Sequence, residues 1–491
     1  MKYFISLLFL STVLFGQKNI PQDTAFVKQA TVTINGKNYS YSVETGFQPV
    51  WNEKNKAVAT LHYTYYTLNT NDPKGERPLL ISFNGGPGSG SVWMHLAYTG
   101  PKILNIDDEG NPIQPYGVKD NPNSVLDIAD IVYVNPVNTG YSRPITDEDG
   151  NYDRNYFFGI NADINYLARW LNTFVTRKNK WRNPKYLIGE SYGGTRVAGL
   201  AHRLQSTHWM YLNGVIMVSP ANYQVLSDAE ILLHTTNLPY FTAAAWYHKQ
   251  LPPELQSKDL LEILPEVEQF TLNTYLPALA KGGFLPDTER KLMAKELAKR
   301  TGLEPKFIEQ NNLRVNNAAF WKELLKNESG FSIGRLDSRY LGLDKTEAGS
   351  APDYNAELIS WLHSFTPAVN YYFNEELGLK IDHAYHMFGD VRPWDRRNDN
   401  TQEQLRQALA QNPYLHILYQ TGYYDGATTY FQTKYSMQNL DPSGKLKERL
   451  SFKGYRSGHM MYLRAEDLKN ANQDVREFIL KTSKKGTAAK Y

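Results

Sequence analysis

Cysteine is absent from this chain of 491 residues. The absence excludes disulfides, a thiol nucleophile and any cysteine-ligated metal site. Long apolar runs are also missing beyond the N-terminus, where no stretch approaches the roughly 18 residues of a membrane-spanning helix. Neither sign of charge dominates, because 53 Lys and Arg face 50 Asp and Glu, for a net charge of +3. Without a basic stripe, the sequence gives no indication of nucleic acid binding.

The N-terminus carries the pattern of a secretory signal peptide. Lys2 precedes an apolar run from Tyr3 to Phe15, which ends at Gly16. A positive residue, a short apolar segment and a small residue are typical of such signals, and the run is too short to span a bilayer. A buried N-terminal strand or helix is the alternative. We expect residues 1–16 to be removed and the mature protein to be exported, periplasmic or secreted, with no stable membrane anchor.

The rest of the chain divides into three stretches. Residues 17–220 alternate strand-like and helix-like segments, beginning with a hairpin signal at Asn35-Gly36, and this alternation predicts a parallel sheet in an α/β domain. Residues 221–384 are helix-rich and interrupted by proline, which indicates a helical cap inserted over the site. Residues 385–491 return to strands and end in a helix. Apolar strand runs are Pro78 to Phe83, Ile128 to Asn135, Tyr186 to Ile188, Gly214 to Val218 and Leu415 to Gln420.

A candidate nucleophile lies in the run Gly189 to Gly193, with sequence GESYG. This is the nucleophile-elbow pattern, in which a serine occupies a tight turn between a strand and a helix. Glycines flank the serine because the strained turn leaves no room for side chains. A strand run precedes Ser191 and a helical segment follows it, so we predict Ser191 as the nucleophile. A glycine-rich turn without a catalytic role is the alternative.

A nucleophilic serine needs a base, and the base needs an orienting acid. In folds with this elbow the chain order is serine, acid, histidine. Asp425 follows the strand run Leu415 to Gln420, and His459 comes 34 residues later in a loop that begins with a glycine. The rival His416 lies inside a strand run and before the acid. We therefore predict Asp425 as the orienting acid and His459 as the base.

Two backbone N–H groups should stabilise the oxyanion of an acyl transfer. In folds with this elbow one donor is the residue after the nucleophile, here Tyr192, and the other comes from a loop after an early strand. The run Asn84 to Gly88, with sequence NGGPG, follows the strand run Pro78 to Phe83. We predict Gly86 as the second donor. A plain glycine-proline turn is the alternative.

These motifs together resemble the serine carboxypeptidase family. The resemblance rests on NGGPG at residues 84–88, NPV at residues 135–137, GYS at residues 140–142, GESYGG at residues 189–194, Asp425 and GHM at residues 458–460. It implies an α/β-hydrolase fold with a helical cap. It also implies an enzyme that releases the C-terminal residue of peptide substrates through an acyl-enzyme, most effectively at acidic pH and with no cofactor.

The resemblance further implies that Asn84 and Glu190 recognise the free carboxylate of the substrate. An ionised Glu190 would repel that carboxylate, whereas a protonated one can donate a hydrogen bond. The alternative is that Glu190 braces the elbow. This chain has Ser89 where many members of the family carry cysteine, and Tyr98 where the family often has a second glutamate. A tyrosine cannot form a pair of carboxyl groups, so strict C-terminal specificity and an acidic optimum are open.

Two weaker motifs are a group of histidines near Asp390 and a pair of arginines in the predicted cap. His383, His386 and Asp390 do not have a standard zinc spacing, and we predict no metal. Arg335 and Arg339 could face an anionic group of the substrate, or could be solvated or paired, for instance with Asp337. The open alternatives for function are an esterase, an acyltransferase or a proline-releasing aminopeptidase on the same scaffold, and a hydrolase fold retained as a binding protein. The sequence does not determine the oligomeric state.

Overall fold

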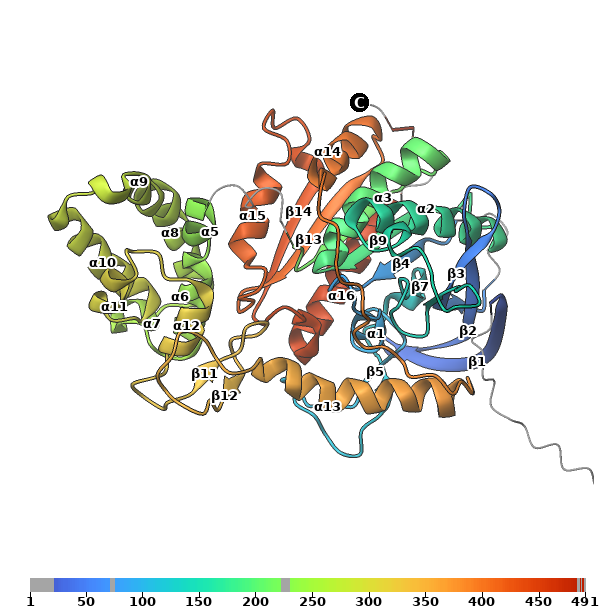
Figure 1. Ribbon diagram of the computed structural model, residues 1–491, viewed down its shortest axis with the longest axis horizontal. Coiled ribbons are helices and arrows are strands. Elements are labelled where there is room, and N and C mark those ends of the chain that lie inside the picture. The colour runs from blue at the N-terminus through green and yellow to red at the C-terminus, as the bar shows by residue number, and fades with distance from the viewer. Residues whose placement is uncertain (1–21, 71–75, 222–229, 484–485, 487, 490–491) are drawn as a thin grey trace, which may run out of the picture.

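The computed structural model describes residues 22–70, 76–221, 230–483, 486 and 488–489, so the predicted signal segment 1–16 lies outside the described residues. A ten-stranded sheet crosses the molecule (Figure 1). Its path runs β1-β2-β3-β7-β4-β9-β10-β13-β14, with β8 paired to β3. The strands, in that order, are Thr24–Ile34, Lys37–Trp51, Ala57–Leu68, Asp130–Val134, Leu79–Phe83, Lys185–Glu190, Gly214–Val218, His416–Gly422 and Leu450–Tyr455, with β8 at Arg143–Pro144.

The first strands form an antiparallel edge, and the remaining strands are parallel. β1 and β2 form the hairpin that Asn35-Gly36 predicts, with Ile34 opposite Lys37. Both turn residues have positive φ, 49° for Asn35 and 76° for Gly36, as a two-residue hairpin turn requires. From β7 to β14 the neighbouring strands are parallel. The predicted parallel sheet of an α/β domain is confirmed.

Apart from the edge strand β14, the parallel strands are buried on both faces, which explains their largely apolar sequences. In β4, Leu80 packs into one core cluster while Leu79 and Ile81 pack into the other. Helices α2 (Ile160–Arg177), α3 (Tyr192–His208) and α14 (Thr401–Gln411) cover one face. Helices α1 (Val92–His95), α13 (Ala356–Tyr371) and α16 (Ala465–Thr482) cover the other. Helix α15 (Tyr430–Gln438) contacts β13 and β14.

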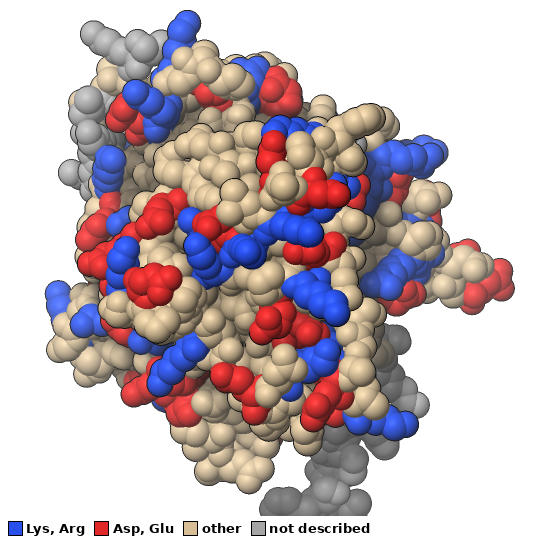
Figure 2. Space-filling model, turned by 90° about the vertical axis from the view of Figure 1, so that its left-hand side faces the viewer, with Lys and Arg blue, Asp and Glu red and all other residues tan. Residues whose placement is uncertain are grey.

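A helical lobe extends from one side of the sheet domain (Figure 1). It has its own apolar core, in which Phe241 stacks on Phe320 with ring centroids 4.1 Å apart. Its helices α5 to α12 are Glu230–Thr236, Leu238–Tyr247, Pro253–Gln256, Leu260–Phe270, Leu276–Ala280, Asp287–Thr301, Pro305–Gln310 and Asn317–Glu323. On the side of the molecule where this lobe lies, acidic and basic side chains are interspersed and neither sign gathers in one patch (Figure 2).

The segment that the sequence indicates as a cap, 221–384, has two packing environments. Helices α5 to α12 pack mainly on one another, whereas α13 packs on the sheet domain through Trp361, Phe365 and Val369. Two small hairpins complete the fold: β5 and β6 (Lys102–Leu104 and Val118–Asp120), and β11 and β12 (Ser332–Ile333 and Leu341–Gly342). Among the described helices, none is both long and apolar enough to cross a bilayer.

Candidate active site

Ser191 occupies the turn between β9 and α3. Its φ is +59°, a strained value for a residue with a side chain, and its N–H donates to the carbonyl of Val218 at 2.9 Å. The flanking glycines are required by close packing. A Cβ on Gly189 would lie 2.1 Å from the carbonyl oxygen of Gly193, and one on Gly193 would lie 2.9 Å from the oxygen of Phe83. The geometry is that of the predicted nucleophile elbow.

The loop of residues 84–88 lies directly against this elbow. It follows β4, which pairs with β9 in parallel. A Cβ on Gly85 would lie 2.6 Å from both the carbonyl oxygen of Glu190 and the backbone nitrogen of Tyr192. Gly86 has a φ of +105°, which favours glycine. The two predicted oxyanion donors, Gly86 and Tyr192, therefore belong to backbone segments in close contact.

A buried ion pair fixes the loop to helix α3. The Arg196 guanidinium donates to the carbonyl of Asn84 at 2.5 Å and to that of Pro87 at 3.4 Å. Asp163 of α2 accepts from Arg196 at 2.7 Å, and both side chains are inaccessible to solvent. Arg196 is not among the residues that the sequence motifs predict. Its place one helical turn after the nucleophile, on a face turned toward the sheet, is the signal that could have found it.

Asp425 and His459 form a buried pair beyond the ends of β13 and β14. His459 Nδ1 lies 2.7 Å from Asp425 Oδ2, and the backbone N–H groups of Ala427 and Thr428 donate to the other carboxylate oxygen at 2.8 and 3.1 Å. Burial disfavours the imidazolium, but the Asp425 carboxylate and its hydrogen bond raise the pKa of His459 above its ordinary value. Because Nδ1 is engaged by Asp425, Nε2 is the ring nitrogen left to exchange a proton.

Glu190 is a buried carboxyl next to the nucleophile. Asn84 donates its amide N–H to one oxygen, and the Tyr462 hydroxyl donates to the other at 2.6 Å. Burial raises its pKa to about 7, against the influence of the nearby His459 and of both hydrogen bonds. The Asn84 amide oxygen in turn accepts from the N–H of Met94 at 3.1 Å. The structure thus brings together the two residues predicted to recognise a carboxylate.

Tyr98, which counting along the loop puts at the position of the family's second glutamate, makes no hydrogen bond to Glu190. Its hydroxyl donates to Gln420 at 2.6 Å, and its ring stacks on Tyr462 with centroids 4.8 Å apart. The residue that contacts the Glu190 carboxyl is Tyr462, three positions after His459. Counting along the loop could not find it, because Tyr462 reaches the site from the other end of the chain.

A cavity of about 700 Å³ joins these groups. Ser191, His459, Glu190 and Asn84 all line it, together with Gly86. Its apolar wall consists of Trp93, Leu233, Leu336, Leu358, Phe388, Val391, Trp394 and Met460. A cavity of this size with a few convergent polar groups has the character of a small-molecule or peptide site.

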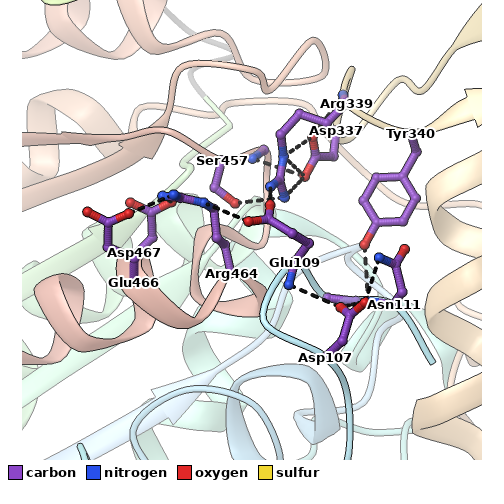
Figure 3. Close-up of polar contacts among 12 residues, drawn as sticks. Asp107, Glu109, Asn111, Asp337, Arg339, Tyr340, Ser457, Arg464, Glu466 and Asp467 are labelled. Carbon is purple, nitrogen blue, oxygen red and sulfur yellow. Dashed lines mark hydrogen bonds and ion pairs between the residues drawn. The ribbon is translucent and has the colours of Figure 1, made fainter. Parts of the chain in front are cut away.

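The loop that carries His459 is held by a network of charged side chains (Figure 3). Asp337 pairs with Arg339 at 2.8 Å and also accepts from the N–H of Gly458 at 3.2 Å. Leu336 accepts from the N–H of His459 at 2.6 Å. Arg339 also contacts Glu109, which lies 3.4 Å from Arg464 (Figure 3). The pairing of Arg339 with Asp337, one of the sequence alternatives, is confirmed.

The histidines considered for a metal do not converge with acids. His386 Nδ1 lies 3.1 Å from the carbonyl of Asn138, and Asp390 pairs with Arg154 at 3.5 Å. Across residues 22–70, 76–221, 230–483, 486 and 488–489, no group of three or more histidine, aspartate or glutamate side chains is placed to hold a metal.

Comparison with known proteins supports the motif assignment. The family model described as serine carboxypeptidase matches residues 35–249. Serine carboxypeptidase-like 10 of Arabidopsis thaliana is 26% identical over 210 residues, which cover 41% of this chain and 44% of that protein. Serine carboxypeptidase-like 36 of the same plant is 30% identical over 184 residues, covering 35% of this chain and 34% of the relative. The chain thus matches less than half the length of these curated relatives.

A solved structure extends the likeness in fold to nearly the whole chain. Kex1, a prohormone-processing carboxypeptidase from Saccharomyces cerevisiae, is similar with a TM-score of 0.53 and 15% sequence identity. The alignment covers 90% of this chain and 91% of that chain. The mostly parallel sheet, the helices on its two faces and this similarity establish the fold. Residues 35–249 of the chain thus match the serine carboxypeptidase family, and the fold is that of the α/β-hydrolases.

Proposed function

We propose that this protein is an exported serine carboxypeptidase. The observation that carries the proposal is the buried pair of His459 and Asp425, 2.7 Å apart, on the wall of the cavity that Ser191 and Glu190 also line. A nucleophile in an elbow, a base oriented by a carboxylate and a neighbouring carboxyl that burial keeps partly protonated are the groups such an enzyme needs. Peptides with a free C-terminus are the proposed substrates.

The proposed reaction proceeds through an acyl-enzyme. Ser191 Oγ attacks the carbonyl carbon of the last peptide bond while His459 Nε2 takes its proton. The N–H groups of Gly86 and Tyr192 stabilise the oxyanion. The C–N bond then breaks, and His459 gives the proton to the departing amino acid. Water attacks the acyl-enzyme with His459 again as the base, which releases the shortened peptide and restores Ser191.

Recognition of the C-terminal carboxylate is assigned to Asn84 and Glu190. Since burial raises the pKa of Glu190 to about 7, the group is largely protonated in mildly acidic solution and can donate a hydrogen bond to a carboxylate. The Tyr462 hydroxyl fixes its orientation. The proposal therefore does not require a second glutamate at the position of Tyr98.

The test is timed mass spectrometry of N-blocked peptides, each supplied as free acid and as C-terminal amide, from about pH 4 to 8. Loss of one C-terminal residue from the free acid alone, absent in Ser191→Ala, is the expected result. Equal cleavage of the amide would refute carboxylate recognition, and turnover of esters alone would favour an esterase. No turnover of any substrate would favour the binding-protein alternative.

Export is a separate part of the proposal and rests on residues 1–16 alone. N-terminal sequencing of protein recovered from the medium or periplasm is expected to give a mature chain that begins near Gln17. A chain that keeps Met1 and stays in the cytoplasm would refute it.

A further inference from the structure

The wall of the catalytic cavity carries more positive than negative charge. Arg335, Arg392 and Arg396 line it, whereas Asp390 and Glu190 are its acids. Asp390 is paired with Arg154, which does not line the cavity, and Glu190 is held by Asn84 and Tyr462 and is partly protonated near neutral pH. The side chains that line the cavity therefore carry a net positive charge.

Of these arginines, Arg335 has the most direct structural link to the loops that carry Asp425 and His459. Its carbonyl accepts from the N–H of Gly426 at 3.0 Å, and the next residue, Leu336, accepts from the N–H of His459 at 2.6 Å. The backbone of Arg335 is thus fixed between the loop of the acid Asp425 and the loop of the base. Its side chain is exposed at the cavity and close enough to His459 for its charge to oppose protonation of the ring.

Arg335 differs from its neighbour Arg339 in forming no close ion pair, although its positive charge acts through space on the buried Glu357 carboxyl and opposes the rise of the Glu357 pKa that burial causes. Arg339 is 5% exposed and paired with Asp337 and Glu109. Within the part of the chain that the structure describes, no carboxylate lies within ion-pair distance of the Arg335 guanidinium. A solvent-exposed guanidinium at a cavity keeps its planar fork of donors available, and that fork matches the geometry of a carboxylate.

We infer that Arg335 forms an anion subsite for the departing residue, so that the enzyme favours peptides ending in aspartate or glutamate. The inference rests on the proposed function. The departing amino acid receives its proton from His459. The Arg335 carbonyl accepts from Gly426 in the Asp425 loop and the adjacent Leu336 accepts from His459, which places Arg335 on the leaving-group side. The side-chain carboxylate of that residue is the anion that the guanidinium binds, while Asn84 and Glu190 bind the terminal carboxylate.

The first test measures binding without turnover. Ser191→Ala is titrated with N-benzoyl-Phe-Glu and N-benzoyl-Phe-Gln, and binding is followed by fluorescence of Trp93 and Trp394, which line the cavity. The glutamate peptide is expected to bind about 5- to 10-fold more tightly, because a partly exposed carboxylate–guanidinium pair contributes about 1 kcal/mol. Adding Arg335→Gln should abolish the difference, and Arg335→Lys should restore only part of it.

Arg182→Gln is the matched control, since Arg182 is an exposed arginine near the opposite end of β9 from Ser191. It should leave the preference unchanged. A preference that survives Arg335→Gln would overturn the subsite. The transposed peptide N-benzoyl-Glu-Phe should bind alike with and without Arg335, and a change confined to this peptide would overturn the leaving-side assignment.

Turnover by the enzyme with Ser191 intact separates this inference from the proposed function. Release of both glutamate and glutamine, with a kcat/KM ratio that Arg335→Gln leaves unchanged, would overturn the subsite and leave the carboxypeptidase intact. An Arg335-dependent preference in binding, with no release from either peptide, would overturn the carboxypeptidase and leave the subsite intact. We expect the enzyme to release both glutamate and glutamine, with a kcat/KM about 5- to 10-fold higher for glutamate, and we expect Arg335→Gln to remove this preference.

Discussion

The two walls of the active site are built by different means. The nucleophile wall, residues 84–88 and 189–196, is held mainly by backbone contacts, with the buried pair of Arg196 and Asp163 behind the loop: β4 pairs with β9, and glycines let the loop and the elbow touch. The histidine wall, residues 334–340, 422–429 and 457–464, depends on charged side chains from distant parts of the sequence, above all Asp337 and Arg339 (Figure 3).

The two walls are therefore vulnerable to different kinds of substitution. A backbone contact leaves no room, so even one methyl group on the nucleophile wall displaces the oxyanion donors. A buried ion pair on the histidine wall is costly to break on one side only, because the remaining charge is left without a partner. Changes to the two walls should therefore differ in the way they impair the enzyme.

The largest effect on kcat is expected from substituting Asp425, the residue of the histidine wall that contacts the predicted base. Asp425→Asn keeps the shape but replaces the carboxylate that accepts from His459 Nδ1. The imidazole would then lose both its orientation and the stabilisation of its cation, so kcat should fall about 10³- to 10⁴-fold with an unchanged thermal midpoint. Steady-state kinetics on the best free-acid peptide measures this loss of kcat, with Ser191→Ala as the inactive reference. A loss of tenfold or less would show that Asp425 is not the orienting acid.

Gly85→Ala probes the nucleophile wall. The added Cβ would lie 2.6 Å from the backbone oxygen of Glu190 and the backbone nitrogen of Tyr192, so the loop must move away from the elbow. Misplaced oxyanion donors are expected to cost about 10²-fold in kcat. Gly117→Ala is the matched control, because nothing lies within 4 Å of its Cβ position. Full activity in Gly85→Ala would argue that the loop does not carry the oxyanion hole.

The contrast between the walls also explains why some residues of the site are predictable from the sequence and others are not. Ser191 and the loop of residues 84–88 each follow an apolar strand at a turn whose glycines are dictated locally, so short motifs specify them. His459 could be assigned by chain order. The residues that support the site could not be predicted in this way. Asp337 contacts Gly458, and Tyr462 contacts Glu190, only because the fold brings distant parts of the chain together. The same limit explains why counting residues selected Tyr98.

Arg339→Met should test the support of the histidine wall. It leaves the Asp337 carboxylate, 2% exposed, without its cation, at a cost of about 3–5 kcal/mol in the free energy of unfolding. A displaced Gly458 should also lower kcat, by about tenfold. Urea unfolding and kinetics on the same samples measure both effects.

Two further variants sharpen that test. Combining Arg339→Met with Asp337→Asn removes the unpaired charge yet keeps an acceptor for the N–H of Gly458, and should recover more than half of the lost stability. Glu109→Gln alters a contact whose carboxylate side is 56% exposed, and should cost about 1 kcal/mol or less, declining with added salt. Equal losses in Glu109→Gln and Arg339→Met would contradict the role of burial.

The smallest effect on the kinetics is expected at Glu190, and it depends on pH. The wild-type KM for free-acid peptides should rise several-fold as the pH increases through about 7, because the ionised carboxylate repels the substrate. In Glu190→Gln this rise should disappear, whereas the dependence of kcat on His459 should persist. KM profiles between pH 5 and 8, with C-terminal amides as the reference, measure it.

Glu190 should also link stability to pH, with a definite sign. Burial raises its pKa from 4.5 in the unfolded chain to about 7 in the folded one, so the folded protein binds more protons between those values. Its contribution is complete below pH 4.5 and is lost as the pH rises through about 7. The stability of the wild type relative to Glu190→Gln should therefore fall by on the order of 3 kcal/mol from pH 4.5 to 8. A difference that is constant with pH would mean that folding does not raise the pKa of Glu190, so that the group is ionised near neutral pH and cannot donate a hydrogen bond to a carboxylate there.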